Sequence, residues 1–153
     1  MTRNDRERID DTSKAIIEQL QADGRRSYAA IGQAVGLSEA AVRQRVQKLV
    51  EAGVMQIVAV TDPTQLGFAR QAMIGVSVTG DVIAVAESLA AITEVDYVVV
   101  TAGAFDVIAE VVVEDDGHLL DLVGRIRAVE GVTRTESFLY LRLVKQTYNW
   151  GAR

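Results

Sequence analysis

The sequence of 153 residues contains no cysteine, one histidine and one proline. Without cysteine the chain has no disulfide, no thiol nucleophile and no cysteine-ligated zinc site. The single histidine, His118, leaves few general bases and no histidine pair for a metal ion. We therefore expect a protein that is not an enzyme and that holds neither a metal ion nor a cofactor.

Long apolar runs are also missing. No stretch of 18 or more apolar residues occurs, so we expect no membrane-spanning helix. Residues 1–8 are charged and lack the apolar core of a signal peptide, which predicts a cytoplasmic protein. Hydrophobic residues still make up 49% of the chain, enough to build a buried core.

The charge is divided unevenly along the chain. Residues 1–60 carry nine basic and eight acidic residues, a net charge of +1, whereas residues 61–153 carry seven and thirteen, a net charge of −6. The total of −5 therefore comes from the second part. The weakly basic first part can still bind nucleic acid if its cations share one face.

Two parts of the chain also differ in hydrophobic pattern. Apolar residues recur at helical spacing over residues 9–52, whereas runs of β-branched residues alternate with helical stretches from residue 72 onward. The only proline, Pro63, lies between them and is followed by Gly67. These features predict a helical domain at residues 1–60, a linker at 61–70 and a second domain at 71–153.

The first domain reads as three short helices. We expect helices at residues 12–22, capped by Asp11 or Ser13, and at 28–35, capped by Ser27, and a third helix that is capped by Ser38 and runs to residue 52. Gly36 and Leu37 make a tight turn between the last two helices, and a strand is expected at 54–60. Helix, glycine-containing turn and helix in this order are typical of a helix-turn-helix.

The third helix of this domain has an unusual exposed face. Val42, Val46, Leu49 and Val50 are expected on its buried side, and the other side carries amides, cations and few carboxylates. Amides pair with base edges, and basic side chains reach phosphates or guanine, so this face predicts binding to double-stranded operator DNA. The candidate DNA-binding residues are Ser38, Arg43, Gln44, Arg45, Gln47 and Lys48. The alternative is a helical module that contacts proteins, in a small-molecule-binding oligomer.

The second domain follows the order strand, helix, strand, strand, helix, strand. We expect strands at 72–78, 95–101, 107–113 and 133–145, and helices at 82–92 and from 116 to about 130. This is the ferredoxin-like βαββαβ order, so the fold class is α+β with a sandwich of two helices on a four-stranded antiparallel sheet. In residues 98–100 and 138–143, apolar side chains occur at positions that point to both faces of the sheet. The helices can cover only one face, so this pattern predicts that a second subunit covers the other.

Several short segments together carry a family resemblance. They are residues 9–10, 20–25, 35–38, 45–49, 53–55, 61–63, 66–67 and 103–106. In this order and spacing the chain resembles the leucine-responsive and asparagine-operon (Lrp/AsnC) regulators over nearly its whole length. The resemblance implies a DNA-binding transcriptional regulator with an amino-acid-sensing αβ-sandwich, which forms homodimers and higher assemblies such as octamers.

The resemblance also places an amino-acid effector between dimers, at the loop joining the second and third strands. In this chain that loop is residues 101–106, and its candidate residues are Thr101, Gly103, Ala104 and Asp106. A weaker correspondence adds Thr133 and Thr135 from a neighbouring subunit. Ala102 departs from the family, in which a hydroxyl residue usually precedes the glycine.

Two of these loop residues have a structural and a functional interpretation. Gly103 is either a hairpin residue with positive φ or a position that exposes backbone N–H groups to a carboxylate. Asp106 caps the turn, binds a ligand ammonium group, or does both.

Overall fold

The computed structural model describes residues 9–152. Its elements are, in order, α1 (Asp11–Ala22), α2 (Tyr28–Val35), α3 (Glu39–Glu51), the 3-10 helix η1 (Pro63–Leu66), β1 (Arg70–Val78), α4 (Val82–Ala90), β2 (Val95–Val100), β3 (Val107–Val113), α5 (Asp116–Arg127) and β4 (Val132–Leu139). Contacts divide the chain into two compact units. The helical unit comprises the chain up to Val60 together with the chain from Lys145 onward, and the sheet unit is Thr61–Val144.

The helical unit is built from α1, α2 and α3 around a small core. The buried residues of this core are Ile16, Leu20, Ile31, Val42 and Val46. Ser27 and Ser38 cap α2 and α3, and Gly36 ends α2 at φ 74°, as the sequence predicts. The predicted cap of α1 is wrong, because the carboxylate of Asp10 accepts the Ser13 N–H at 2.7 Å. Asp10 has extended backbone geometry, the conformation of an N-cap residue.

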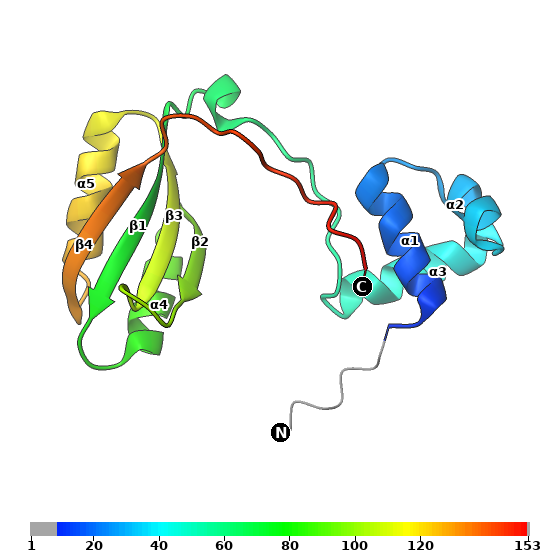
Figure 1. Ribbon diagram of the computed structural model, residues 1–153, viewed down its shortest axis with the longest axis horizontal. Coiled ribbons are helices and arrows are strands. Elements are labelled where there is room, and N and C mark those ends of the chain that lie inside the picture. Colours follow the sequence, from blue (N-terminus) through cyan, green and yellow to red (C-terminus); the bar gives the residue numbers. More distant parts are fainter. Residues whose placement is uncertain (1–8, 153) are drawn as a thin grey trace. The chain divides into compact units, whose positions relative to one another are not determined.

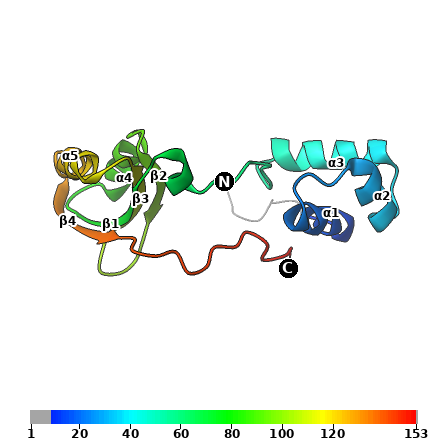
Figure 2. The same cartoon turned by 90° about the horizontal axis from the view of Figure 1, so that it is seen from above.

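The sheet unit has four strands in the order β2-β3-β1-β4, and all its pairings are antiparallel. Figures 1 and 2 show α4 and α5 on the same face of this sheet. The core lies between the helices and that face, where Ile74, Val76, Leu89, Leu122 and Ile126 are among the buried side chains. This architecture confirms the predicted α+β, ferredoxin-like fold.

Two strand predictions are wrong. Residues 54–60 have the alternation and β-branched residues of a strand, but no described segment pairs with them, and Val58 and Val60 are exposed. A strand exists only where a neighbour satisfies its backbone groups. The last strand ends at Leu139 and not near residue 145, because β1 begins at Arg70 and its last bond to this segment is the one that Gln71 O accepts from the Tyr140 N–H.

The chain beyond residue 144 belongs with the helical unit by its contacts, whereas the sequence suggested one domain from residue 71 to the end. The Gly151 N–H donates to the side-chain oxygen of Gln21 in α1 at 3.1 Å. Both ends of the described chain therefore take part in one unit. Among residues 9–152, no helix is both long enough and apolar enough to cross a lipid bilayer.

Candidate nucleic-acid interface and ligand site

The outer face of α3 presents Gln44 and Lys48 to solvent. Val42, Val46 and Leu49 are buried against the rest of the helical unit, which fixes the opposite side of α3 as its exposed face. The prediction that Val50 is buried with them is wrong, because Val50 is 44% exposed near the end of the helix. Within residues 9–152, no hydrogen bond or ion pair engages the side chains of Gln44 or Lys48. One amide and one ammonium group on this face are thus available to a ligand.

Two other candidates on α3 have acidic neighbours on the same helix. Arg43 donates to Glu39 at 2.7 Å, and its guanidinium lies 5.2 Å from the centre of the Tyr28 ring. The Gln47 amide donates to Glu51 at 2.8 Å. The face therefore carries more carboxylates than the sequence suggested. Glu39 binds Arg43 and Glu51 binds Gln47, and both of these partners are predicted DNA contacts.

Arg45 points toward α1. Its Nη1 donates to Asp10 Oδ2 at 2.7 Å and to Ser13 Oγ at 3.0 Å. The hydrogen bond from Arg45, followed by those from Ser13, lowers the pKa of Asp10 to about 2. The side chain of Arg45 thus joins α3 to the start of α1.

Ser38 occupies the start of α3. Its Oγ accepts the Ala41 N–H at 3.2 Å, which satisfies one of the free donors of the first helical turn. Its backbone is extended, and the side chain is exposed. Ser38 therefore has a structural role in α3 whatever else it contacts.

The loop between β2 and β3 is closed by its own hydrogen bonds. Thr101 Oγ1 donates to Phe105 O at 2.6 Å, and Thr101 N donates to Asp106 O at 2.9 Å. Gly103 and Ala104 are exposed in this loop. Gly103 is not among the glycines with positive φ, and a Cβ built on it meets nothing within 4 Å. The interpretation of Gly103 as a positive-φ hairpin residue is therefore wrong.

Asp106 connects this loop to the end of β1. Its N–H donates to Val76 O at 3.0 Å, and its Oδ2 accepts the Val78 N–H at 2.7 Å. The register of β1 with β4 shifts between Ser77 and Val78, so the carboxylate binds an N–H beside an interruption of the ladder. The structure thus gives one carboxylate oxygen of Asp106 the turn-capping role.

The aromatic residue of the loop was not among the sequence candidates. The ring of Phe105 covers Gly75 in the middle of β1, where an added Cβ would lie only 2.5 Å from the ring. It also packs edge-on against Phe138 at 6.1 Å. Because Ile74 and Val76 face the helices, Phe105 lies on the opposite face of the sheet. A glycine inside a strand pattern was the available signal.

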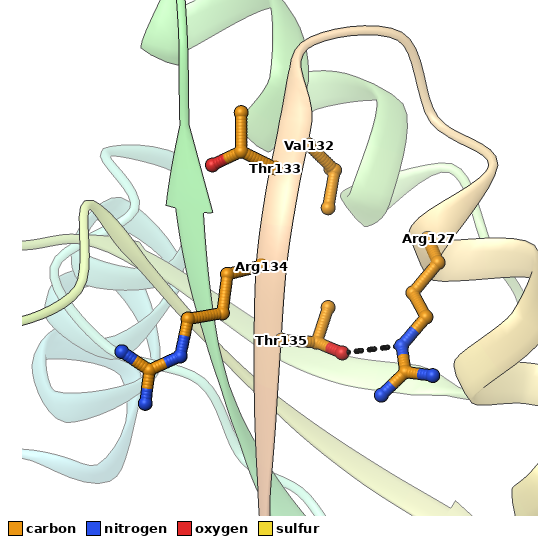
Figure 3. A pocket seen from close by; sticks show the side chains of 5 residues that line it. All are labelled: Arg127, Val132, Thr133, Arg134 and Thr135. Atoms are coloured by element: carbon orange, nitrogen blue, oxygen red, sulfur yellow. Dashed lines mark hydrogen bonds between the residues drawn. The ribbon is translucent and has the colours of Figure 1, made fainter.

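Thr133 and Thr135 lie at the start of β4. Thr133 Oγ1 donates to Ser77 O at 3.1 Å, so it meets the same end of β1 as Asp106. Thr135 Oγ1 accepts from Arg127 Nε at 2.8 Å. These residues border a hollow of about 320 Å³, shown in Figure 3, which is lined by Arg127, Val132, Thr133, Arg134 and Thr135.

Comparisons with known proteins agree for both units. Residues 9–50 match the AsnC-type helix-turn-helix domain, and residues 71–150 match the Lrp/AsnC ligand binding domain. An uncharacterised HTH-type transcriptional regulator of Pyrococcus furiosus is 35% identical over 146 residues, which cover 92% of this chain and 97% of the relative.

Two solved structures illustrate the likeness. The leucine response regulatory protein of Mycobacterium tuberculosis aligns with a TM-score of 0.78 and 30% identity, covering 90% of this chain and 95% of the other. A transcriptional regulator of Neisseria meningitidis in complex with L-Met aligns with a TM-score of 0.79 and 26% identity, covering 92% and 94%.

Proposed function

The chain belongs to the Lrp/AsnC family of transcriptional regulators, and we propose that it reads its operator with the outer face of α3 and senses an amino acid through the 101–106 loop. It is a DNA-binding transcriptional regulator with a helix-turn-helix and a ligand-binding domain. We propose no catalytic activity, and we place its action in the cytoplasm. The observation that carries the proposal is that Gln44 and Lys48, on a helix of the matching domain, bond to no other side chain among residues 9–152.

Gln44 and Lys48 have different roles in this proposal. A glutamine amide can donate to and accept from an adenine edge at once, so Gln44 distinguishes sequences. Lys48 carries a mobile point charge and contacts a phosphate, which gives affinity for any sequence. Arg43 and Gln47 add to the surface if DNA displaces their bonds to Glu39 and Glu51.

A gel-shift titration with the region upstream of its own gene tests DNA reading. Lys48→Ala should weaken binding to all sequences and reduce the salt slope by about 1. Gln44→Ala should cost about 1–3 kcal/mol on the operator and little on unrelated DNA. Arg142→Ala, an exposed cation of the sheet unit, is the matched control. Unchanged binding in both α3 variants would refute the assignment, and no DNA binding at all would favour a module for protein contacts.

The proposed effector site rests on the exposed Gly103 and Ala104 and on the nearby Asp106 and Thr133. Backbone N–H groups in the loop suit a carboxylate, and Asp106 suits an ammonium group. The L-Met complex of the Neisseria meningitidis relative supports an amino acid as the ligand class.

A thermal-shift screen of the common amino acids tests this site. A ligand that binds only the folded chain raises its melting temperature, and calorimetry with that amino acid then gives an affinity. Gly103→Thr should abolish this affinity and leave DNA binding without effector intact. Unchanged affinity in Gly103→Thr would place the site elsewhere.

We also propose that the active unit is at least a homodimer joined through the sheet face opposite the helices. That face carries Met73, Tyr97 and Phe138, whose exposed fractions are 37%, 55% and 45%. Apolar side chains gathered on one open face favour a second copy as the cover. Higher assemblies such as an octamer are proposed from family membership alone.

A further inference from the structure

Tyr28 and Arg43 meet where α2 lies beside the beginning of α3, an arrangement that Figures 1 and 2 show. Tyr28 is the first residue of α2, and Ser27 caps this helix by accepting the Ala30 N–H on its Oγ at 3.2 Å. The Tyr28 ring is half-buried and packs against the core of the helical unit. The ring is therefore a fixed surface at the edge of the exposed face of α3.

The guanidinium of Arg43 is held from two sides. Its central carbon lies over the Tyr28 ring, 5.2 Å from the ring centre, which is within the range of a cation–π contact. Its Nη2 donates to Glu39 Oε1 at 2.7 Å, one turn earlier on α3. The side chain of Arg43 is nevertheless 61% exposed, so its other N–H groups remain open to solvent. Arg43 is thus an exposed donor group whose position is set before any ligand arrives.

Arg43 lies next to the residues that we propose to contact DNA. Residues four apart follow one another along a helix surface, so Arg43 and Gln47 form one row and Gln44 and Lys48 form the next. Arg43 stands on the side of its row that faces α2, since its guanidinium lies over the Tyr28 ring. A DNA groove that receives Gln44 therefore comes within reach of Arg43.

A guanidinium held in this way suits a base more than a phosphate. It donates through a rigid planar fork, which matches two acceptor atoms that lie side by side. Guanine presents such a pair, O6 and N7, in the major groove. A mobile ammonium group such as that of Lys48 can follow a phosphate without any support, whereas the two bonds to a guanine edge require a set orientation. The support of the Tyr28 ring therefore favours guanine as the partner of Arg43.

We infer that Arg43 reads a guanine of the operator and that Tyr28 is the positioning residue that holds it for this contact. The inference rests on the proposed function, because it requires that the outer face of α3 reads DNA. Glu39 accepts from Arg43 in the absence of DNA and gives way to the guanine, while the ring keeps the guanidinium in place. Tyr28 was not among the sequence candidates, and it acts on the base only through Arg43.

Modified DNA tests the contact between Arg43 and guanine. A duplex that the parent protein selects from a randomised pool serves as the operator, and each of its guanines is replaced in turn by 7-deazaguanine, which lacks the N7 acceptor. The parent should lose about tenfold in affinity at one guanine, because a bidentate contact discriminates by about that factor. Arg43→Ala should bind the unmodified duplex about tenfold more weakly than the parent and lose nothing further at that guanine. An Arg43→Ala variant that is as sensitive as the parent at every guanine would overturn the inference.

Variants of Tyr28 test the positioning role. Tyr28→Leu keeps an apolar side chain against the core and removes the ring, so its affinity for the unmodified duplex should fall about threefold while its affinity for the 7-deazaguanine duplex stays that of the parent. Tyr28→Phe keeps the ring and should discriminate like the parent. Tyr148→Leu, the same change at an exposed tyrosine elsewhere in the helical unit, is the matched control. A loss of folding would weaken binding to both duplexes equally and could not imitate this pattern.

The possible outcomes separate this inference from the proposed function. Tyr28→Leu with the guanine preference of the parent would overturn the positioning role. An equal loss on both duplexes in Tyr28→Phe would assign the hydroxyl to a phosphate and would also overturn it. If Gln44→Ala and Lys48→Ala weaken binding and Arg43→Ala does not, the inference fails and the proposed function stands. If the parent enriches no sequence from the pool, both fail.

Discussion

At the scale of single residues, Arg45 and Lys48 show how two cations of one helix differ in role. Arg45 is bound to Asp10 and Ser13, whereas Lys48 is exposed and has no described partner. We expect Arg45→Ala to lower the melting temperature of the helical unit by roughly 5 °C and to weaken binding to every DNA sequence. Lys48→Ala should weaken binding without a change in melting temperature. Circular dichroism melts combined with gel shifts separate the two effects, and a stable Arg45→Ala variant would contradict this role.

The contact between Gly75 and Phe105 gives a second prediction at this scale. A Cβ at residue 75 would lie 2.5 Å from the ring, so Gly75→Ala must displace the ring and the loop that carries it. Overpacking of this kind costs about 1–3 kcal/mol, measurable by urea unfolding. Gly103→Ala is the matched control, because its Cβ meets nothing within 4 Å. If Phe105→Ala fails to relieve the effect of Gly75→Ala, the ring is not its cause.

The sequence could not assign these residue roles, although it identified most of the positions. Asp10 and Arg45 are 35 residues apart, and no local pattern predicts their contact. Likewise, Arg127 comes directly after the apolar stripe of a predicted helix and has the sequence pattern of an ordinary solvent-facing residue. Only the tertiary fold brings it to Thr135. Side chains that lie on a predicted face can be found from periodicity, but their partners depend on tertiary structure.

At the scale of elements, prediction succeeded where the signals are local. The serine caps and Gly36 define α2 and α3, and hydrophobic periodicity defines the strand and helix order of the sheet unit. The strand predicted at residues 54–60 is absent because pairing is not local: a good strand sequence stays unpaired when no partner lies beside it. The predicted end of β4 was wrong for the same reason, since the length of β1 determines where β4 stops pairing.

Glu94 connects two elements and makes their contact sensitive to acid. It precedes β2 and binds Arg125 of α5 through both carboxylate oxygens, at 2.7 and 3.0 Å. The bonds from Arg125, and then His118, lower the pKa of Glu94 from 4.5 to about 2. The stabilisation is therefore complete above pH 4.5 and is lost as the pH falls through about 2.

We expect Glu94→Gln to lower the free energy of unfolding by about 1 kcal/mol at pH 7, with the difference from the parent vanishing near pH 2. Urea unfolding at a series of pH values measures this. Glu87→Gln, an exposed acid of α4 outside the described ion pairs, should follow the parent throughout. A difference for Glu94→Gln that persists at pH 2 would assign the loss to packing.

At the scale of the whole molecule, the open sheet face predicts the assembly. Phe138→Asp places a charge on that face, on the edge strand β4 and next to Phe105. A stable dimer buries about 800 Å² on each partner, and an unpaired charge buried within the contact opposes such burial. Sedimentation should therefore show a dimer or larger parent and a monomeric Phe138→Asp variant.

Leu120→Asp is the control for this experiment. Leu120 is 73% exposed on α5, on the other side of the sheet, so its variant should assemble like the parent. A parent that is monomeric at micromolar concentration, or a dimeric Phe138→Asp variant, would rule out this face as the interface. A two-fold pair of α3 helices would also require operator half-sites about 34 Å apart or a multiple of that distance.

The return of the chain to the helical unit has a consequence for biosynthesis. The three helices leave the ribosome before the sheet unit, and Gly151 follows the sheet unit. The Gln21 side chain can therefore accept the Gly151 N–H only after the entire sheet unit has been translated. A message cut short after residue 144 would encode every helix and strand described within residues 9–152 and would still produce a helical unit that lacks the segment carrying Gly151.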